Sequence, residues 1–99
     1  MKKLSRTFDL TKEAQDFLLK LQPKQYKQVT SRVIDLANDP EPQDSEALNG
    51  PKAKQEKLRR IDVGEFRIIY RYDAVVVAVF IIGNRNDGKV YQNIENKLF

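Results

Sequence analysis

A continuous run of apolar residues does most to limit what this 99-residue chain can fold into. The run extends from Val75 to Ile82, is rich in β-branched side chains and is followed by Gly83. A strand without polar alternation is covered on both faces, which is typical of the interior of a sheet. The chain is therefore expected to fold around a sheet in which residues 75–82 form a central strand.

Three further strands are predicted before this run. A short first strand covers residues 4–10. Residues 58–63 and 66–72 form the other two, and the compact turn at Gly64-Glu65 should join them as an antiparallel pair. Because side chains alternate along a strand, each strand has two distinct faces. In the 66–72 strand, Phe66, Ile68 and Tyr70 share one face, and Arg67, Ile69 and Arg71 share the other.

Two helices are predicted between the first strand and this pair. Thr11 is a plausible N-cap of the first helix. Pro23 suits the first position of the second, which should stop at Asn38-Asp39-Pro40. Apolar residues recur at helical spacing in both, so the two helices should pack as a hairpin on the sheet. The stripes are Ala14, Phe17, Leu18 and Leu21 in the first helix, and Tyr26, Val29, Val33, Ile34 and Ala37 in the second.

The remaining segments are predicted to be loop and tail. Residues 38–56 are polar and turn-forming, so they are expected to form one loop, with Leu48 as its anchor to the core. Residues 92–99 are expected to form a short C-terminal helical tail. The predicted fold class is α+β, with element order β-α-α-β-β-β. In a single domain of residues 1–99, the helical hairpin packs on one face of a mainly antiparallel four-stranded sheet.

The side-chain inventory excludes several classes of function. The chain has no His and no Cys, so a His/Cys zinc site and a disulfide framework are impossible, and neither a metal nor a cofactor is predicted. No apolar stretch approaches the roughly 18 residues that span a bilayer, and no signal peptide is evident, so the cytoplasm is the expected location. The net charge of +4 arises entirely within residues 51–99. That imbalance suggests an anionic partner, although a solvated lysine-rich surface has the same composition.

Basic residues are expected around the sheet face opposite the helices. Arg67 projects from that face, and the segment after the central strand carries Arg85 and Lys89 to its rim. Arg60 and Asp62 share one side of their strand and join Arg67 if the register allows. The result would be a concave face with several guanidinium groups and few aliphatic side chains, suited to charge-assisted contacts with phosphate. Further phosphate-binding candidates are Lys52, Lys54 and Lys57.

Each of these residues also has a purely structural interpretation. Arg67 can pair with Glu65 or Asp62, and Arg85 can pair with Asp87, as exposed ion pairs do. Tyr91 can be a core tyrosine with a solvated hydroxyl. The lysines can simply be solvated, so the prediction depends on the joint arrangement.

The chain resembles the RelE/ParE superfamily of bacterial and archaeal toxins over nearly its whole length. The most specific segment is Gly64-Glu65-Phe66-Arg67-Ile68-Ile69-Tyr70. The helical hairpin, the valine-rich strand, and Gly83-Asn84-Arg85 followed by Val90-Tyr91 also match. These motifs do not separate the RelE branch from the ParE branch, but two arginines and a tyrosine at the nuclease positions favour RelE.

RelE-type toxins are metal-independent endoribonucleases that cut mRNA in the ribosomal A site, by attack of a 2′-hydroxyl on the adjacent phosphate. The resemblance implies that Arg67 holds the scissile phosphate and that Arg85 assists the leaving 5′-oxygen. It implies that Tyr91 stacks on a base or orients the attacking hydroxyl. It also implies three partners: a cognate antitoxin, the ribosome and mRNA.

The strand before Gly64 departs from the pattern of the family's ribonucleases, which often carry two lysines there, one of them a general base. Arg60 and Asp62 stand at the corresponding positions. Arginine is a poor base. Asp62 can accept the 2′-hydroxyl proton or be inert, and Lys57 or Lys54 can supply the missing cation, so the identity of the base stays open.

Two other functions stay open beside mRNA cleavage. One is a ParE-like inhibitor of DNA gyrase without nuclease activity, which shares the fold and is compatible with Asp62. The other is an attenuated toxin that only binds its antitoxin. An acidic, amphipathic antitoxin segment is expected to cover the basic face in every case.

Overall fold

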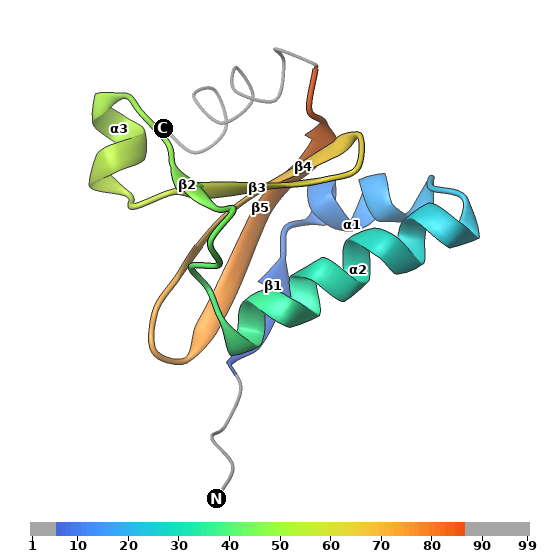
Figure 1. The fold of residues 1–99 in the computed structure, drawn as a ribbon, viewed down its shortest axis with the longest axis horizontal. Coiled ribbons are helices and arrows are strands. Elements are labelled where there is room, and N and C mark those ends of the chain that lie inside the picture. Colours follow the sequence, from blue (N-terminus) through green and yellow to red (C-terminus); the bar gives the residue numbers. More distant parts are fainter. Residues whose placement is uncertain (1–5, 87–99) are drawn as a thin grey trace, which may run out of the picture.

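A computed structural model of the chain describes residues 6–86 (Figure 1). Two helices cover one face of a five-stranded sheet, and a short third helix lies on the opposite side. The α+β class predicted from sequence is therefore confirmed. The elements are β1 (Thr7–Leu10), α1 (Lys12–Leu19), α2 (Pro23–Asn38), β2 (Glu46–Ala47), α3 (Pro51–Gln55), β3 (Arg59–Val63), β4 (Phe66–Tyr72) and β5 (Val76–Asn84).

The helical hairpin begins at the residues that the sequence predicts. Thr11 is the N-cap of α1, where its hydroxyl accepts a hydrogen bond from the Ala14 N–H at 3.1 Å. The same hydroxyl donates to the Phe80 carbonyl at 2.6 Å, which ties the start of α1 to β5. Pro23 is the first residue of α2, where a missing N–H costs nothing.

The sheet has the strand order β1-β5-β4-β3-β2. The apolar strand β5 lies between β1 and β4, so its predicted interior position is confirmed. Strand β1 runs parallel to β5, and the other pairs are antiparallel. The predicted count of four strands is wrong by one, because the two residues of β2 pair with β3 at Glu46↔Arg60 and Ala47↔Arg59.

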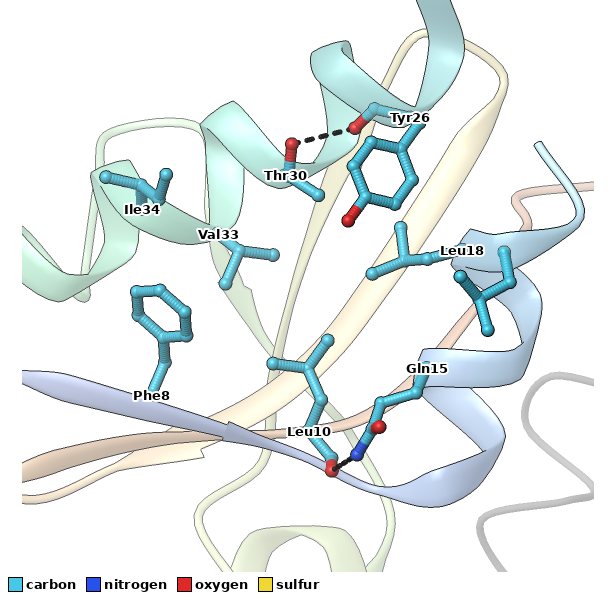
Figure 2. Close-up of a pocket in the computed structure, with 9 residues that line it drawn as sticks. Phe8, Leu10, Gln15, Leu18, Tyr26, Thr30, Val33 and Ile34 are labelled. Atoms are coloured by element: carbon cyan, nitrogen blue, oxygen red, sulfur yellow. Dashed lines mark hydrogen bonds between the residues drawn. The ribbon is translucent and has the colours of Figure 1, made fainter. Parts of the chain in front are cut away.

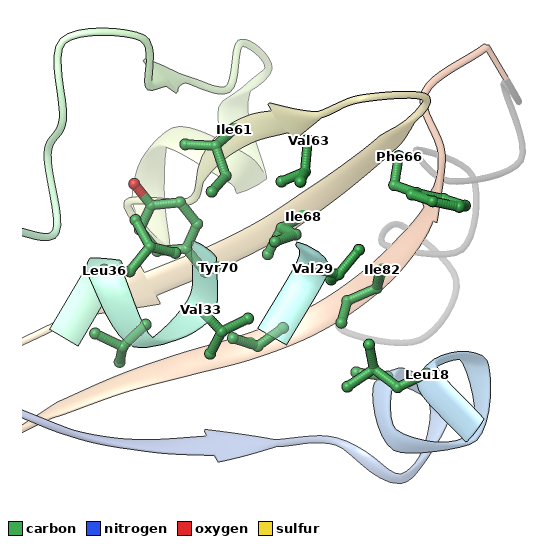
Figure 3. Packing of buried hydrophobic residues seen from close by; sticks show 13 residues of the cluster. Leu18, Val29, Val33, Leu36, Ile61, Val63, Phe66, Ile68, Tyr70 and Ile82 are labelled. Atoms are coloured by element: carbon green, nitrogen blue, oxygen red, sulfur yellow. The ribbon is translucent and has the colours of Figure 1, made fainter. Parts of the chain in front are cut away.

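The main core lies between the helical hairpin and the sheet (Figure 3). Phe66, Ile68 and Tyr70 of β4 point toward the helices, as their alternation predicts. The buried hydroxyl of Tyr70 donates to the Pro40 carbonyl at 2.6 Å, so the segment after α2 is fixed to the same core. This packing leaves Arg67 on the opposite face of the sheet.

The predicted apolar stripe of α2 is partly wrong. Tyr26 and Ile34 are exposed, because α2 turns a neighbouring row of side chains toward the sheet and leaves these two on its flank. Leu36, which the prediction omitted, is fully buried instead. The buried residues of α2 are Val29, Val33, Leu36 and Ala37.

The prediction that residues 38–56 form one loop is also wrong. The segment contains β2 and the single-turn helix α3, which Pro51 begins. Leu48 is buried, as predicted, but it belongs to a second apolar cluster on the face opposite α1 and α2. Helix α3 thus covers part of the sheet face around which the basic residues are expected. The cluster consists of Leu48, Ala53, Leu58, Ile69 and Ile81, with Phe80 packed against it.

The predicted helical tail, residues 92–99, lies outside the described residues, as do residues 4 and 5 of the predicted first strand. Between residues 6 and 86, no helix is both long enough and apolar enough to span a membrane.

Candidate phosphate-binding site

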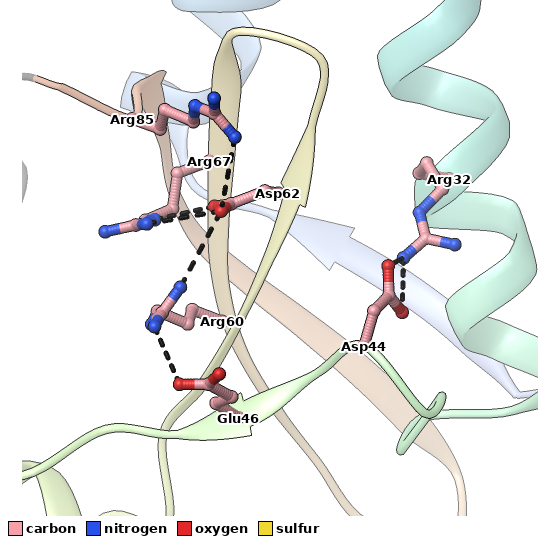
Figure 4. A network of polar contacts seen from close by, with 7 residues as sticks. All are labelled: Arg32, Asp44, Glu46, Arg60, Asp62, Arg67 and Arg85. Atoms are coloured by element: carbon pink, nitrogen blue, oxygen red, sulfur yellow. Dashed lines mark hydrogen bonds and ion pairs between the residues drawn. The ribbon is translucent and has the colours of Figure 1, made fainter.

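The β3–β4 hairpin places a carboxylate beside a guanidinium. Its register pairs Asp62 directly with Arg67, and both side chains lie on the face away from the helical hairpin (Figure 4). Arg67 Nε donates to Asp62 Oδ1 at 2.7 Å, and Arg67 Nη2 donates to Oδ2 at 3.3 Å. An arginine binds a phosphate through the same forked geometry.

Two further arginines approach the same carboxylate. Arg60, two residues earlier in β3, has Nη1 at 3.8 Å from Asp62 Oδ2, and Arg85, just past β5, has its Nη1 at 3.8 Å from the same oxygen. The Arg85 N–H donates to the Glu65 carbonyl at 2.9 Å, which fixes the end of β5 beside the hairpin turn. We refer to Arg60, Asp62, Arg67 and Arg85 as the arginine cluster.

Electrostatics keep the carboxylate of the arginine cluster ionised. The hydrogen bond from Arg67 lowers the pKa of Asp62, and the charges of Arg67, Arg60 and Arg85 lower it further, against the opposing effect of burial. Three positive charges and one negative charge leave the cluster at +2. On its outer side Arg60 also donates to Glu46 at 2.7 Å. The side chain of Arg67 is 15% exposed and that of Arg85 is 48% exposed, so the cluster is reachable from solvent.

The structure brings together four of the residues proposed from sequence. Of the two structural partners considered for Arg67, Asp62 is the one that it contacts. Tyr91 and Lys89 lie outside the described residues. Lys52 is exposed on α3, while Lys54 and Lys57 line a separate pocket. Contact of these four lysines with phosphate therefore stays a prediction, as does the role of Tyr91.

The sheet face opposite α1 and α2 is less polar than predicted. Ile69 and Ile81 are buried on it, under the cover of α3. The expectation of few aliphatic side chains on this face is wrong. It assumed that residues 38–56 form a loop, whereas α3 packs over Ile69 and Ile81 and buries them. The arginine cluster therefore shares this face of the sheet with a buried apolar cluster.

Sequence reasoning missed a polar network around Arg59. Arg59 lies opposite Tyr70 in the hairpin and so faces away from the arginine cluster. Its Nη2 donates to the hydroxyl of Ser45 at 2.8 Å, and its Nη1 lies 3.8 Å from Glu41 Oε2. Glu41 also accepts a hydrogen bond from the Tyr72 hydroxyl, which raises the pKa of that phenol. The alternation of side chains along β3 could have predicted this network. Arg59 and Arg60 are consecutive in a strand, so they must point to opposite faces.

Sequence reasoning also missed an apolar groove of about 360 Å³ between β1 and the helical hairpin (Figure 2). Phe8, Leu19, Tyr26 and Ile34 line it and are exposed, with Leu19 at 76% and Ile34 at 50%. Strand β1 is an edge strand of the sheet and forms one wall of the groove. Exposed apolar patches of this kind mark interaction surfaces.

The arrangement is suited to binding a phosphodiester. Its three guanidinium groups offer planar, forked donors that stay charged at any physiological pH. Within residues 6–86, no group of three or more His, Cys, Asp or Glu side chains could hold a metal ion. The positively charged side chains of the arginine cluster are Arg60, Arg67 and Arg85.

A family model for the ParE toxin of the type II toxin–antitoxin system parDE matches residues 8–87. That span covers most of the chain and includes the whole arginine cluster. The chain belongs to the ParE toxin family. As members of type II toxin–antitoxin systems, proteins of this family are toxins, which agrees with the superfamily resemblance seen in the sequence. A comparison with curated protein sequences gives no match.

Solved RelE structures share the fold of this ParE-family chain. A mutant of Escherichia coli toxin RelE in the free state has a TM-score of 0.76 at 18% identity, covering 97% of this chain and 100% of that one. The archaeal RelE–RelB complex from Pyrococcus horikoshii OT3 gives 0.71 at 20% identity, covering 86% and 100%. The toxin–antitoxin complex RelBE2 from Mycobacterium tuberculosis gives 0.68 at 24% identity, covering 83% and 100%.

Proposed function

We propose that this toxin is a ribosome-dependent endoribonuclease that cleaves mRNA in the A site. The observation that carries the proposal is the convergence of Arg60, Arg67 and Arg85 on a single anionic group at distances of 2.7–3.8 Å. Three guanidiniums around one anion are suited to a phosphodiester whose charge increases in the transition state. The likeness to RelE folds supports the same function.

The reaction assigned to this site is attack of a 2′-hydroxyl on the adjacent phosphorus. The P–O5′ bond breaks as the O2′–P bond forms; water takes the proton of the 2′-hydroxyl and supplies one to the departing 5′-oxygen, leaving a 2′,3′-cyclic phosphate and a 5′-hydroxyl. Arg67, the least exposed arginine of the cluster, would hold the non-bridging oxygens. Arg85, at the rim, would stabilise the leaving 5′-oxygen by its charge. Tyr91 would stack on a base or orient the attacking hydroxyl, as the family resemblance implies.

We assign Asp62 the positioning of the arginines rather than the removal of a proton. Its lowered pKa makes it a weaker base than an ordinary carboxylate, and Arg67 already occupies both of its oxygens. Its negative charge offsets the mutual repulsion of the three guanidiniums. A substrate phosphate would replace this carboxylate as the anion that they share.

The partner that we propose for the apolar groove is a cognate antitoxin. Two of the three solved structures compared above are toxin–antitoxin complexes. An amphipathic antitoxin segment could place its apolar side against Tyr26 and Ile34, and an acidic stretch could reach the arginine cluster. Substituting Ile34→Asp should weaken binding of the antitoxin and leave the toxin's own activity in place.

The direct test is in vitro translation on purified ribosomes programmed with a defined mRNA. Wild-type toxin should produce 3′ ends that carry a 2′,3′-cyclic phosphate within the A-site codon, and free RNA should be cut poorly. Arg85→Ala should produce few such ends while retaining the fold by circular dichroism. Cleavage that is equal in the two proteins would remove the arginine cluster from the mechanism.

A second candidate function is inhibition of DNA gyrase without nuclease activity. The match to a ParE family model favours it. A supercoiling assay decides between the ribonuclease and the gyrase inhibitor. Purified gyrase acts on relaxed plasmid, with and without the toxin. Inhibition at stoichiometric toxin, together with intact mRNA in the translation assay, would favour this second function.

A further inference from the structure

A second basic pocket lies beside Arg59, at the end of β3 that pairs with β2. It has a volume of about 490 Å³, within the range of small-ligand sites. Its apolar lining comes from Ala47, Leu48 and Leu58. Five polar side chains also line it, namely Glu41, Lys54, Lys57, Arg59 and Tyr72.

The two lysines of this pocket come from the end of α3. The Leu58 N–H donates to the Ala53 carbonyl at 3.0 Å, which closes the helix and turns the chain back toward β3. Lys57 takes the left-handed conformation at this turn, with φ of 60°, where glycine is the usual residue. Within the described part of the chain, neither lysine ammonium forms an ion pair. Both are available to an anion.

Arg59 provides the third cation. The hydroxyl of Ser45, itself buried and donating to the Pro42 carbonyl, holds the guanidinium at 2.8 Å. The Nε of Arg59 is buried without an acceptor among the described residues. Glu41 is the only carboxylate among the lining residues of this pocket, so three positive charges face one negative charge.

We propose that this pocket binds one nucleoside-phosphate unit of single-stranded RNA. The excess of cations suits the phosphate, and the apolar lining with Tyr72 suits a nucleobase, since bases stack on aromatic and apolar surfaces with little sequence preference. A bare inorganic anion would leave the apolar lining unused.

The position of the pocket relative to the arginine cluster explains why RNA is the ligand. Arg59 and Arg60 are consecutive in β3 and point to opposite faces, and both lie beside the two-residue edge strand β2. A strand of RNA bound at the arginine cluster can pass over this short edge and place a neighbouring nucleotide in the second pocket. In this respect the inference rests on the proposed function and adds a subsite to it.

The test compares two variants with equal loss of charge. Lys54→Ala/Lys57→Ala removes the lysines of the pocket, and Lys24→Ala/Lys27→Ala removes two exposed lysines of α2 that do not line it. Binding of a labelled 2′-O-methyl oligoribonucleotide, which resists cleavage, is measured across a salt series. The pocket variant should bind about tenfold more weakly at low salt. Its slope of log K against log[salt] should be shallower by about 0.7 for each phosphate that it no longer neutralises. The control should stay close to wild type.

Nuclear magnetic resonance separates the possible ligands. Adenosine 5′-monophosphate should shift the amide signals of Leu48, Leu58 and Tyr72 in the wild-type toxin and not in the pocket variant, and inorganic phosphate should bind more weakly than the nucleotide. Shifts confined to the arginine cluster, or equal oligonucleotide binding by the two variants, would overturn the inference. A pocket variant that binds the antitoxin more weakly but binds RNA as the wild type does would also overturn the inference.

The two proposals fail in distinguishable ways. If wild-type toxin cuts mRNA but the two double variants bind RNA equally, only the second pocket is refuted. If the wild type cuts no mRNA and the pocket still binds the nucleotide, the ribonuclease proposal is refuted and the binding site stands.

Discussion

Arg67 and Ile68 are neighbours in β4, yet they occupy opposite environments. Ile68 is fully buried under the helical hairpin with the rest of the main core. Arg67 lies on the other face, where α3 covers only one part and the arginine cluster remains reachable from solvent. One strand can therefore serve stability on one side and ligand binding on the other, because adjacent side chains point in opposite directions.

The largest expected effects come from substituting these two neighbours. Ile68→Ala removes a fully buried side chain and should lower the free energy of unfolding by about 2–5 kcal/mol. Arg67→Ala should change stability far less but reduce cleavage by about 100- to 1,000-fold, the scale typical of removing one charge-stabilising donor. Urea unfolding of both variants gives the change in the free energy of unfolding, and a ribosomal cleavage assay gives the change in cleavage rate.

A large loss of stability in Arg67→Ala would contradict this division between a stabilising Ile68 and a ligand-binding Arg67. If Arg67→Ala unfolds the protein as readily as Ile68→Ala does, then Arg67 belongs to the structural framework and its loss of activity carries no mechanistic information.

A smaller effect is expected from Asp62→Asn, which keeps the shape of the side chain and removes its charge. The arginine cluster changes from +2 to +3, so RNA affinity should rise by several-fold, while cleavage falls only about tenfold because Arg67 loses its charged partner. If Asp62 is instead the general base, cleavage should fall by about 100- to 10,000-fold. Separate measurement of binding and single-turnover cleavage distinguishes the two.

The same carboxylate should contribute to acid sensitivity. Because its pKa is lower in the folded state than the ordinary value near 3.8, Asp62 stabilises the fold fully above about pH 4, and this contribution is lost as pH falls through the folded pKa. Asp62→Asn should therefore flatten the decline in stability below about pH 4. An unchanged acid-unfolding profile would show that the Asp62–Arg67 pair contributes no net stability.

The smallest effect concerns the end of α3. Lys57→Gly relieves a side chain held at φ of 60° and should raise stability by about 0.5–1 kcal/mol. Lys57→Ala removes the same charge but keeps the Cβ, so it is the matched control and should give no such gain. Thermal unfolding of both variants is sufficient, and an equal change in the two would attribute the effect to charge rather than to the backbone.

Periodicity made the faces of the sheet predictable from sequence. Alternation along residues 66–72 separated Arg67 from the core, and the apolar run 75–82 identified an interior strand. The Gly64 turn fixed the register that pairs Asp62 with Arg67. These are local patterns that tertiary packing did not override.

Features that depend on distant contacts were not predictable in the same way. The single turn of α3 is too short to show periodicity, and it is held by burial of Leu48 and Ala53 against β4 and β5. The exposure of Ile34 depends on which side of α2 turns toward the sheet. The basic pocket around Arg59 needed α3 and β2 in place before its lysines could line it.

The role proposed for the arginine cluster is to bind a backbone phosphodiester during cleavage of mRNA. Mapping of 5′-hydroxyl RNA ends in cells that express wild-type toxin or Arg67→Ala at equal levels tests it most directly. We expect ends concentrated within translated codons for the wild type and their near disappearance in Arg67→Ala. Growth arrest by the wild type without such ends, or an unchanged set of ends in Arg67→Ala, would contradict it.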